Sequence, residues 1–126
     1  MEKVVIQTNE APAPIGPYNQ AVIAGGFLFI SGQIAIDPLN GELEISSIEA
    51  ETMLVMNNLQ AILKKAGYTF SNVVKTTIFL TDMSLFSIVN GIYGQFFSGN
   101  YPARETVAVK GLPKGVNVEI SMIAFK

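Results

Sequence analysis

Short apolar runs, separated by glycine and proline, dominate the first third of the chain. Residues 18–24 and 27–33 are rich in β-branched and aromatic side chains and flank Gly25 and Gly26. Two glycines between such runs predict a hairpin, because glycine readily supplies positive φ. A short strand is expected over residues 3–7, and the proline-rich residues 11–17 predict a rigid loop.

The next segment has the 3.6-residue spacing of an amphipathic helix. Ser46 followed by Glu49 fits a capping box, and Gly67 supplies a C-terminal stop. The expected buried face consists of Ile48, Thr52, Val55, Leu59, Ile62 and Ala66. Glutamates 42, 44, 49 and 51 lie on or before this helix, where they favour its dipole, and we expect them on the surface.

A second amphipathic helix is expected over residues 85–96, although Gly91 and Gly94 weaken it. Asp82 or Ser84 could cap it. Further strands are expected over residues 73–81, 105–110 and 116–125. The order β-ββ-α-β-α-ββ indicates an α/β (α+β) fold with a sheet of about six strands and two helices on one face. The length favours a single domain, residues 1–126.

Several predicted strands, such as residues 27–30 and 120–125, carry apolar side chains on both faces. Two helices can cover only one face of the sheet, and a chain of 126 residues offers no third layer. Self-association is therefore expected to cover the other face, and a closed symmetric oligomer is the usual form.

The amino-acid composition limits which catalytic groups, metal ligands and partners the protein can have. The chain has no His, Cys or Trp, so thiol nucleophiles, thiolate metal sites and the commonest metal ligand are excluded. With 8 basic and 10 acidic side chains it lacks the basic stripe that nucleic acid requires, so no nucleic-acid partner is expected. We find no signal peptide and no apolar run long enough to span a membrane, and therefore expect a cytoplasmic protein with no membrane partner.

Arg104 is the only arginine, and it stands at the entrance to a predicted strand. A guanidinium can fork onto a planar carboxylate with two parallel charge-assisted bonds, which lysine cannot do. The alternative is a surface arginine paired with its neighbour Glu105.

Glu119 interrupts an otherwise apolar strand. Two interpretations are open. The carboxylate lies in a cleft and has the perturbed pKa of a catalytic acid or base, or it faces solvent on the polar side of an alternating strand. It follows Arg104 by fifteen positions, across a bend with glycine and proline that lets the two meet. The strand register cannot be deduced from sequence.

Four other residues are weaker candidates. Tyr18 offers a phenol after a rigid loop, although a core or interface tyrosine is the simpler interpretation. Ser31 and Gly32 end an apolar strand, where glycine permits close approach of a ligand or marks a bulge. Asn90 could orient a polar ligand or face solvent. We find no phosphate loop, nucleophile elbow or metal-ligand spacing.

Taken together, these segments resemble the Rid family of enamine/imine deaminases, also called YjgF. The resemblance covers nearly the whole chain in order, and the motifs that carry it are APIGPYNQA (13–21), ISGQI (30–34), VKTTIFLTDM (74–83), VNGIYGQFF (89–97), PAR (102–104), LP (112–113) and VEI (118–120). It implies a chorismate-mutase-like fold and a homotrimer with a central barrel and ligand clefts between subunits.

The resemblance also implies site roles. Arg104 would hold the substrate carboxylate with the backbone N–H of Thr106, and Glu119 would position the attacking water. Tyr18, Ser31, Gly32 and Asn90 match positions that line the cleft. Two departures stand out: Glu105 replaces a small or apolar residue, and Thr106 replaces a cysteine found in many members.

The expected function is hydrolysis of reactive 2-imino acids, such as 2-iminobutanoate and 2-iminopropanoate, to 2-oxo acids and ammonia, with no cofactor and no metal. An imine is already electrophilic, so positioning and proton supply suffice. The alternative is a regulatory or chaperone-like module that binds a small carboxylate without physiological turnover. Family relatives have been described as partners of a purine repressor, as chaperones and as translation inhibitors.

Overall fold

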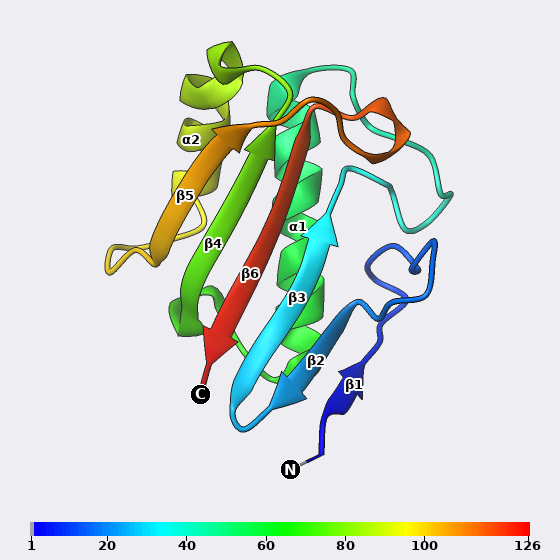
Figure 1. Ribbon diagram of the computed structural model, residues 1–126, viewed down its shortest axis with the longest axis vertical. Helices are drawn as coiled ribbons and strands as arrows, with labels where there is room; N and C mark the ends of the chain where they lie inside the picture. Colours follow the sequence, from blue (N-terminus) through cyan, green and yellow to red (C-terminus); the bar gives the residue numbers. More distant parts are fainter. Residues whose placement is uncertain (1) are drawn as a thin grey trace.

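Six strands form one sheet with two α-helices packed behind it (Figure 1). The computed structural model describes residues 2–126. Along the chain the elements are β1 (Val4–Ile6), β2 (Ala21–Ala24), β3 (Phe27–Gln33), α1 (Ile48–Ala66), β4 (Val73–Leu80), α2 (Phe86–Gly94), β5 (Ala103–Ala108) and β6 (Val118–Phe125). Short 3-10 turns precede β4, α2 and β6. This element order is the one that the sequence predicts.

The strands are arranged in the order β1-β2-β3-β6-β4-β5. Neighbouring strands are antiparallel except β4 and β5, which are parallel and connected through α2. The last strand, β6, therefore lies in the middle of the sheet, and β5 forms one edge (Figure 1). The mixed sheet with two helices on one face confirms the predicted fold class.

The first helix confirms its predicted end and corrects its predicted start. Gly67 adopts the left-handed conformation, φ 84°, and its N–H donates to the carbonyls of the last turn. At the other end Ser47, not Ser46, is the cap, because its Oγ accepts from the Ala50 N–H over 3.0 Å. Ser46 instead donates from its hydroxyl to the Glu44 carboxylate, so the predicted capping box is wrong.

Glu51 is fully buried, and its predicted surface position is wrong. One carboxylate oxygen accepts from the backbone N–H groups of Asn117 (2.7 Å) and Val118 (2.9 Å), and the other accepts from the Asn117 amide (2.9 Å). A buried carboxylate is tolerated when donors satisfy its lone pairs. Glu51 therefore fastens α1 to the start of β6, the strand that carries Glu119.

The hairpin at Gly25 and Gly26 is confirmed, and both residues have positive φ, 59° and 88°. Its first strand starts at Ala21 instead of residue 18, because the chain before it turns: the Tyr18 N–H donates to the Gly16 carbonyl over 2.8 Å. The core lies between the sheet and the helices. Its largest fully buried apolar side chains are Leu28, Met56, Leu59, Ile62, Leu63, Ile78, Leu80, Ile120 and Met122.

The other face of the sheet carries apolar side chains with nothing over them, as the sequence predicts. Phe27, Phe29 and Phe125 are 42–47% exposed, and the rings of Phe27 and Phe125 lie 4.7 Å apart. Figure 1 views this uncovered face, with both helices behind it. No helix within residues 2–126 is long and apolar enough to cross a membrane.

Candidate active site

Arg104 lies on the edge strand β5 and points to the helix-covered face. In the parallel pairing of β4 with β5 it stands opposite Thr76, whose side chain is fully buried. Paired residues point to the same face of a sheet, so this register directs Arg104 toward α2. The strand starts at Ala103, two residues earlier than predicted, and therefore includes Arg104.

Three side chains of α2 hold the guanidinium. Arg104 Nη1 donates to Asn90 Oδ1 over 2.6 Å, and Cζ lies 5.1 Å from the ring centre of Tyr93 and 5.6 Å from that of Phe86. The Tyr93 hydroxyl donates to Thr76 Oγ1 over 2.9 Å. Burial raises the pKa of the Tyr93 phenol, so it stays protonated and keeps donating. These contacts fix the direction of the guanidinium but neutralise none of its charge.

The sequence singled out Asn90 as a possible ligand-orienting residue, but it indicated none of Phe86, Asn90 and Tyr93 as a partner of Arg104. A signal was present, because positions 86, 90 and 93 have the i, i+4, i+7 spacing of one helix face. The spacing does not reveal which strand this helix face covers, because that depends on the tertiary packing.

Within residues 2–126 no carboxylate pairs with Arg104. The one ion pair in this part of the chain joins Lys75 Nζ to Glu105 Oε1 over 3.2 Å. The alternative in which Arg104 pairs with Glu105 is therefore wrong, because successive side chains of a strand point to opposite faces. The remaining guanidinium donors are left for an anionic ligand.

Thr106 lies two residues further along β5, on the same face as Arg104. Just beyond the strand, the Val109 N–H donates to the Leu80 carbonyl of β4 over 2.7 Å. Backbone groups alternate in a parallel ladder, so the N–H of Thr106 points away from β4, to the open edge of the sheet. The Thr106 hydroxyl is buried and has no hydrogen-bond partner.

A cavity of about 340 Å³ opens beside Arg104. Its lining residues are Asn90, Tyr93, Gly94, Tyr101, Pro102 and Arg104. Tyr101 is 65% exposed at the mouth of this cavity, and sequence reasoning did not single it out. The cavity thus combines one cation with aromatic walls, a suitable environment for a small organic anion.

Glu119 lies on the opposite face of the sheet. It stands in β6 between the buried residues Val118 and Ile120, and it pairs across the ladder with Phe79. Its carboxyl group is half-buried, and this burial raises its pKa above the usual range of a glutamate. A carboxyl group with a raised pKa is a candidate general acid or base.

A small second cavity of about 50 Å³ contains Glu119 together with Tyr18 and Gly32. Its other lining residues are Pro12, Ala13, Ile15, Gln20, Gln33, Ile34, Ile36 and Pro113. Ser31 lies beside it and donates from Oγ to the Asn19 carbonyl over 2.6 Å. The structure therefore brings Tyr18, Ser31, Gly32 and Glu119 to one place.

Gln20 holds the loop that carries Tyr18, a role that sequence reasoning missed. Its buried amide donates to the carbonyls of Ala11 (3.2 Å) and Pro12 (2.8 Å), and its oxygen accepts from the Thr8 N–H over 2.8 Å. The Tyr18 hydroxyl accepts from the Ile15 N–H over 3.3 Å. A glutamine directly before an apolar strand carries no pattern that would reveal this set of partners.

The candidate residues thus form two half-sites in one chain. The cation half-site consists of Asn90, Arg104 and Thr106, and the carboxyl half-site consists of Tyr18, Ser31, Gly32 and Glu119. The expectation that the bend before β6 lets Arg104 and Glu119 meet is wrong within the chain. Strand β4 separates their strands, and the register places the two side chains on opposite faces.

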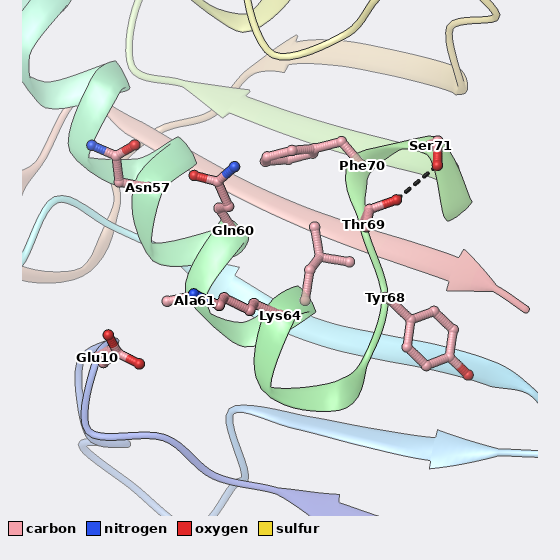
Figure 2. A pocket seen from close by; sticks show the side chains of 10 residues that line it. Glu10, Asn57, Gln60, Ala61, Lys64, Tyr68, Thr69, Phe70 and Ser71 are labelled. Atoms are coloured by element: carbon pink, nitrogen blue, oxygen red, sulfur yellow. Dashed lines mark hydrogen bonds between the residues drawn. The ribbon is translucent and has the colours of Figure 1, made fainter.

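Another groove, of about 660 Å³, lies along the C-terminal half of α1 and the segment before β4 (Figure 2). Its lining side chains are mostly exposed and polar, including Asn57, Gln60 and Lys64, and Thr69 and Ser71 bond to each other over 2.7 Å. It contains none of the candidate residues. Across the part of the chain that the structure describes, no three acidic side chains gather where they could hold a metal ion.

Comparisons with known proteins agree with this fold. The sequence profile of the endoribonuclease L-PSP family matches residues 8–126. A crystal structure of YyfA from Yersinia pestis, described as a protein of unknown function of the conserved Rid protein family, superimposes with a TM-score of 0.96 at 48% identity. That comparison covers 99% of this chain and 100% of YyfA, and it confirms the fold expected from the sequence.

Two relatives differ in their named roles. The human 2-iminobutanoate/2-iminopropanoate deaminase is 46% identical over 122 residues, which are 97% of this chain and 89% of the human protein. The putative regulator AldR of Lactococcus lactis is 52% identical over 120 residues, 95% of each chain.

Proposed function

This chain belongs to the endoribonuclease L-PSP family, also called the Rid or YjgF family, and from that premise we propose that it hydrolyses small 2-imino acids to 2-oxo acids and ammonia. The observation that carries the proposal is the Arg104 guanidinium, which Asn90 and two aromatic rings hold in place without any carboxylate partner among residues 2–126. The substrates are 2-iminobutanoate and 2-iminopropanoate, whose carboxylate matches this cation.

In the proposed reaction Arg104 binds the substrate carboxylate through a bidentate pair, and the Thr106 N–H at the open strand edge donates a further bond. This fixes the neighbouring imine carbon and excludes rotation about the bond to the carboxylate. Positioning is the main requirement, since the C=N bond is already electrophilic.

Glu119 acts on water. The water oxygen adds to the imine carbon while the Glu119 carboxylate takes one of its protons and the imine nitrogen gains a proton. The resulting carbinolamine then expels ammonia as its hydroxyl becomes the carbonyl group, so one water is consumed for each 2-oxo acid and ammonia formed. The raised pKa of Glu119 suits it to accept and return this proton.

We propose that the complete site forms between chains of a homotrimer. The apolar face that carries Glu119 is uncovered, whereas Arg104 lies at the free β5 edge. In a closed trimer the edge of one chain covers that face on the next, so one cation half-site meets one carboxyl half-site. A cytoplasmic location, where dehydratases that depend on pyridoxal phosphate release such imines, is part of the same proposal.

Mixing two inactive variants tests the composite site. Chains of R104K and E119Q are unfolded together and reassembled in equal amounts. We expect about one quarter of the parent activity, because random assembly brings an intact Arg104 and an intact Glu119 together at about one quarter of the interfaces. Sedimentation should give about three chain masses. A mixture of R104K with R104A is the control and should stay inactive. A monomer, or no recovery in the first mixture, would contradict the trimeric site.

The reaction itself is tested by a coupled assay. A threonine dehydratase generates 2-iminobutanoate, and semicarbazide traps the imine that has not yet been hydrolysed. Catalytic amounts of this protein should reduce semicarbazone formation and accelerate release of 2-oxobutanoate. Trapping that is unchanged at micromolar protein would rule out the deaminase function.

Glu105, one of the two departures from the family pattern, is expected to matter little for turnover. It points away from Arg104 and pairs with Lys75 over 3.2 Å. E105S should therefore change kcat/KM for 2-imino acids by less than about threefold, which corresponds to less than about 0.7 kcal/mol. E105Q, which keeps the size of the side chain, is the matched control. A tenfold gain in E105S would mean that Glu105 competes for Arg104.

A binding or regulatory module is the second candidate, and the relationship to AldR favours it. Such a module needs Arg104 to bind a small carboxylate but needs no base. Saturable binding of 2-oxobutanoate without any imine turnover would favour this alternative. Cleavage of RNA has less support, because a formal charge of −2 and a single arginine provide no basic stripe.

A further inference from the structure

Gly32 stands at an irregular point of the sheet. The pairing of β3 with β6 runs from Ile30 opposite Met122 to Gln33 opposite Ile120. Two residues of β3, Ser31 and Gly32, therefore lie opposite the single residue Ser121. Such a bulge commonly redirects side chains next to a site, and here it lies beside Glu119.

The Glu119 side chain occupies the space where any other residue at position 32 would have its Cβ. An ideal Cβ on Gly32 would lie 2.8 Å from Glu119 Cδ, and 3.0 Å from both Cγ and Oε1. Real Cβ atoms essentially never approach heavy atoms closer than 3.0 Å. The carboxyl group therefore packs directly against the backbone of β3.

Backbone conformation does not explain this glycine. Gly32 does not have a positive φ, so an alanine can adopt its backbone conformation without strain. The other glycines without positive φ, Gly16, Gly91, Gly94 and Gly111, would accept a Cβ with no contact shorter than 3.6 Å. What distinguishes Gly32 is the side chain that lies over it.

We propose that Gly32 is a positioning residue for Glu119: its missing side chain creates a slot that holds the carboxyl group against the sheet, in the small cavity that also contains Tyr18. The sequence left two interpretations of this glycine open, close approach of a ligand or a bulge, and the pairing of β3 with β6 agrees with the bulge. In the slot the carboxyl group is half-buried, and Tyr18 is the only other titratable side chain that lines the cavity among residues 2–126. An added methyl group displaces the carboxyl into solvent.

The proposal makes a structural statement that does not depend on the reaction. G32A should lower the melting temperature of the parent more than that of E119A, in which the obstructing side chain is absent; the loss should be small, because the displaced atoms belong to the end of a flexible side chain. G91A, on an open helix surface, is the matched control and should not destabilise either protein. If G32A alone does not fold, recovery of folding in G32A/E119A gives the same answer.

The position of the carboxyl group can be measured directly. In the parent, carboxyl-detected NMR should give Glu119 a pKa above that of an ordinary glutamate, and in G32A this pKa should fall back toward the ordinary value. A G32A protein with unchanged stability and an unchanged Glu119 pKa would overturn the proposal. So would a loss of stability on G32A substitution that is equal in the parent and in E119A.

The catalytic consequence rests on the proposed function. G32A should lower kcat for 2-imino acid hydrolysis by about tenfold or more with KM changed by less than about threefold, and G32A/E119Q should be no slower than E119Q alone. A KM increase with unchanged kcat would assign Gly32 to ligand contact and overturn the positioning role. If the parent has no imine hydrolysis but the melting temperatures and the pKa behave as expected, the slot stands and the deaminase proposal fails.

Discussion

Replacing Arg104 by lysine is expected to lower kcat/KM for 2-iminobutanoate by about 30-fold or more, a loss of at least about 2 kcal/mol of transition-state stabilisation. The guanidinium uses one nitrogen for Asn90 Oδ1 and two rings for stacking, and still retains a planar pair of donors. An ammonium carries the same charge but cannot bond to Asn90 and fork onto a carboxylate at once.

The loss should appear in binding as well as in turnover, because Arg104 holds the carboxylate in the ground state and in the transition state. Calorimetric affinity for 2-oxobutanoate should therefore fall together with kcat/KM. K110R is the matched control, since it exchanges the same two head groups at an exposed position just beyond β5. Activity of R104K within about threefold of the parent would eliminate Arg104 as the carboxylate anchor.

Replacing Glu119 by glutamine is expected to lower kcat by about 100-fold while the affinity for 2-oxobutanoate changes by less than about threefold. Glutamine keeps the shape of the side chain and can still bond to water, but it cannot take a proton. E42Q is the matched control, because it makes the same exchange of groups at an exposed position outside the proposed chemistry. Equal losses in turnover and affinity would mean that Glu119 serves binding only.

The pH dependence provides a second test of Glu119. The proposed base must be ionised, and burial raises its pKa, so it stays protonated at pH values where an ordinary glutamate is already charged. Activity should therefore rise with pH through a midpoint above the usual glutamate range. Dividing the profile of the parent by that of E119Q removes the titration of the imine itself. A ratio that does not depend on pH would contradict the assignment.

Local patterns in the sequence were sufficient for the elements of this fold. Three features depend only on residues close together in the chain: the hairpin at Gly25 and Gly26, the amphipathic helix that ends at Gly67, and the strands with apolar side chains on both faces. The absence of His and Cys likewise left the chemistry to carboxylates, Arg104, lysines, tyrosines, hydroxyls and the backbone. Even the separation of Arg104 from Glu105 follows from the alternation of a single strand.

Relations between distant residues were decided only by the tertiary structure. Glu51 resembles any acidic residue in a first helical turn, yet it is buried because the backbone at Asn117 and Val118 supplies donors 66 and 67 positions away. Phe86 and Tyr93 became partners of Arg104 because α2 packs over β5. The separation of Arg104 and Glu119 onto opposite faces was set by strand register, where a shift of one residue reverses every side chain, and no local pattern encodes that choice.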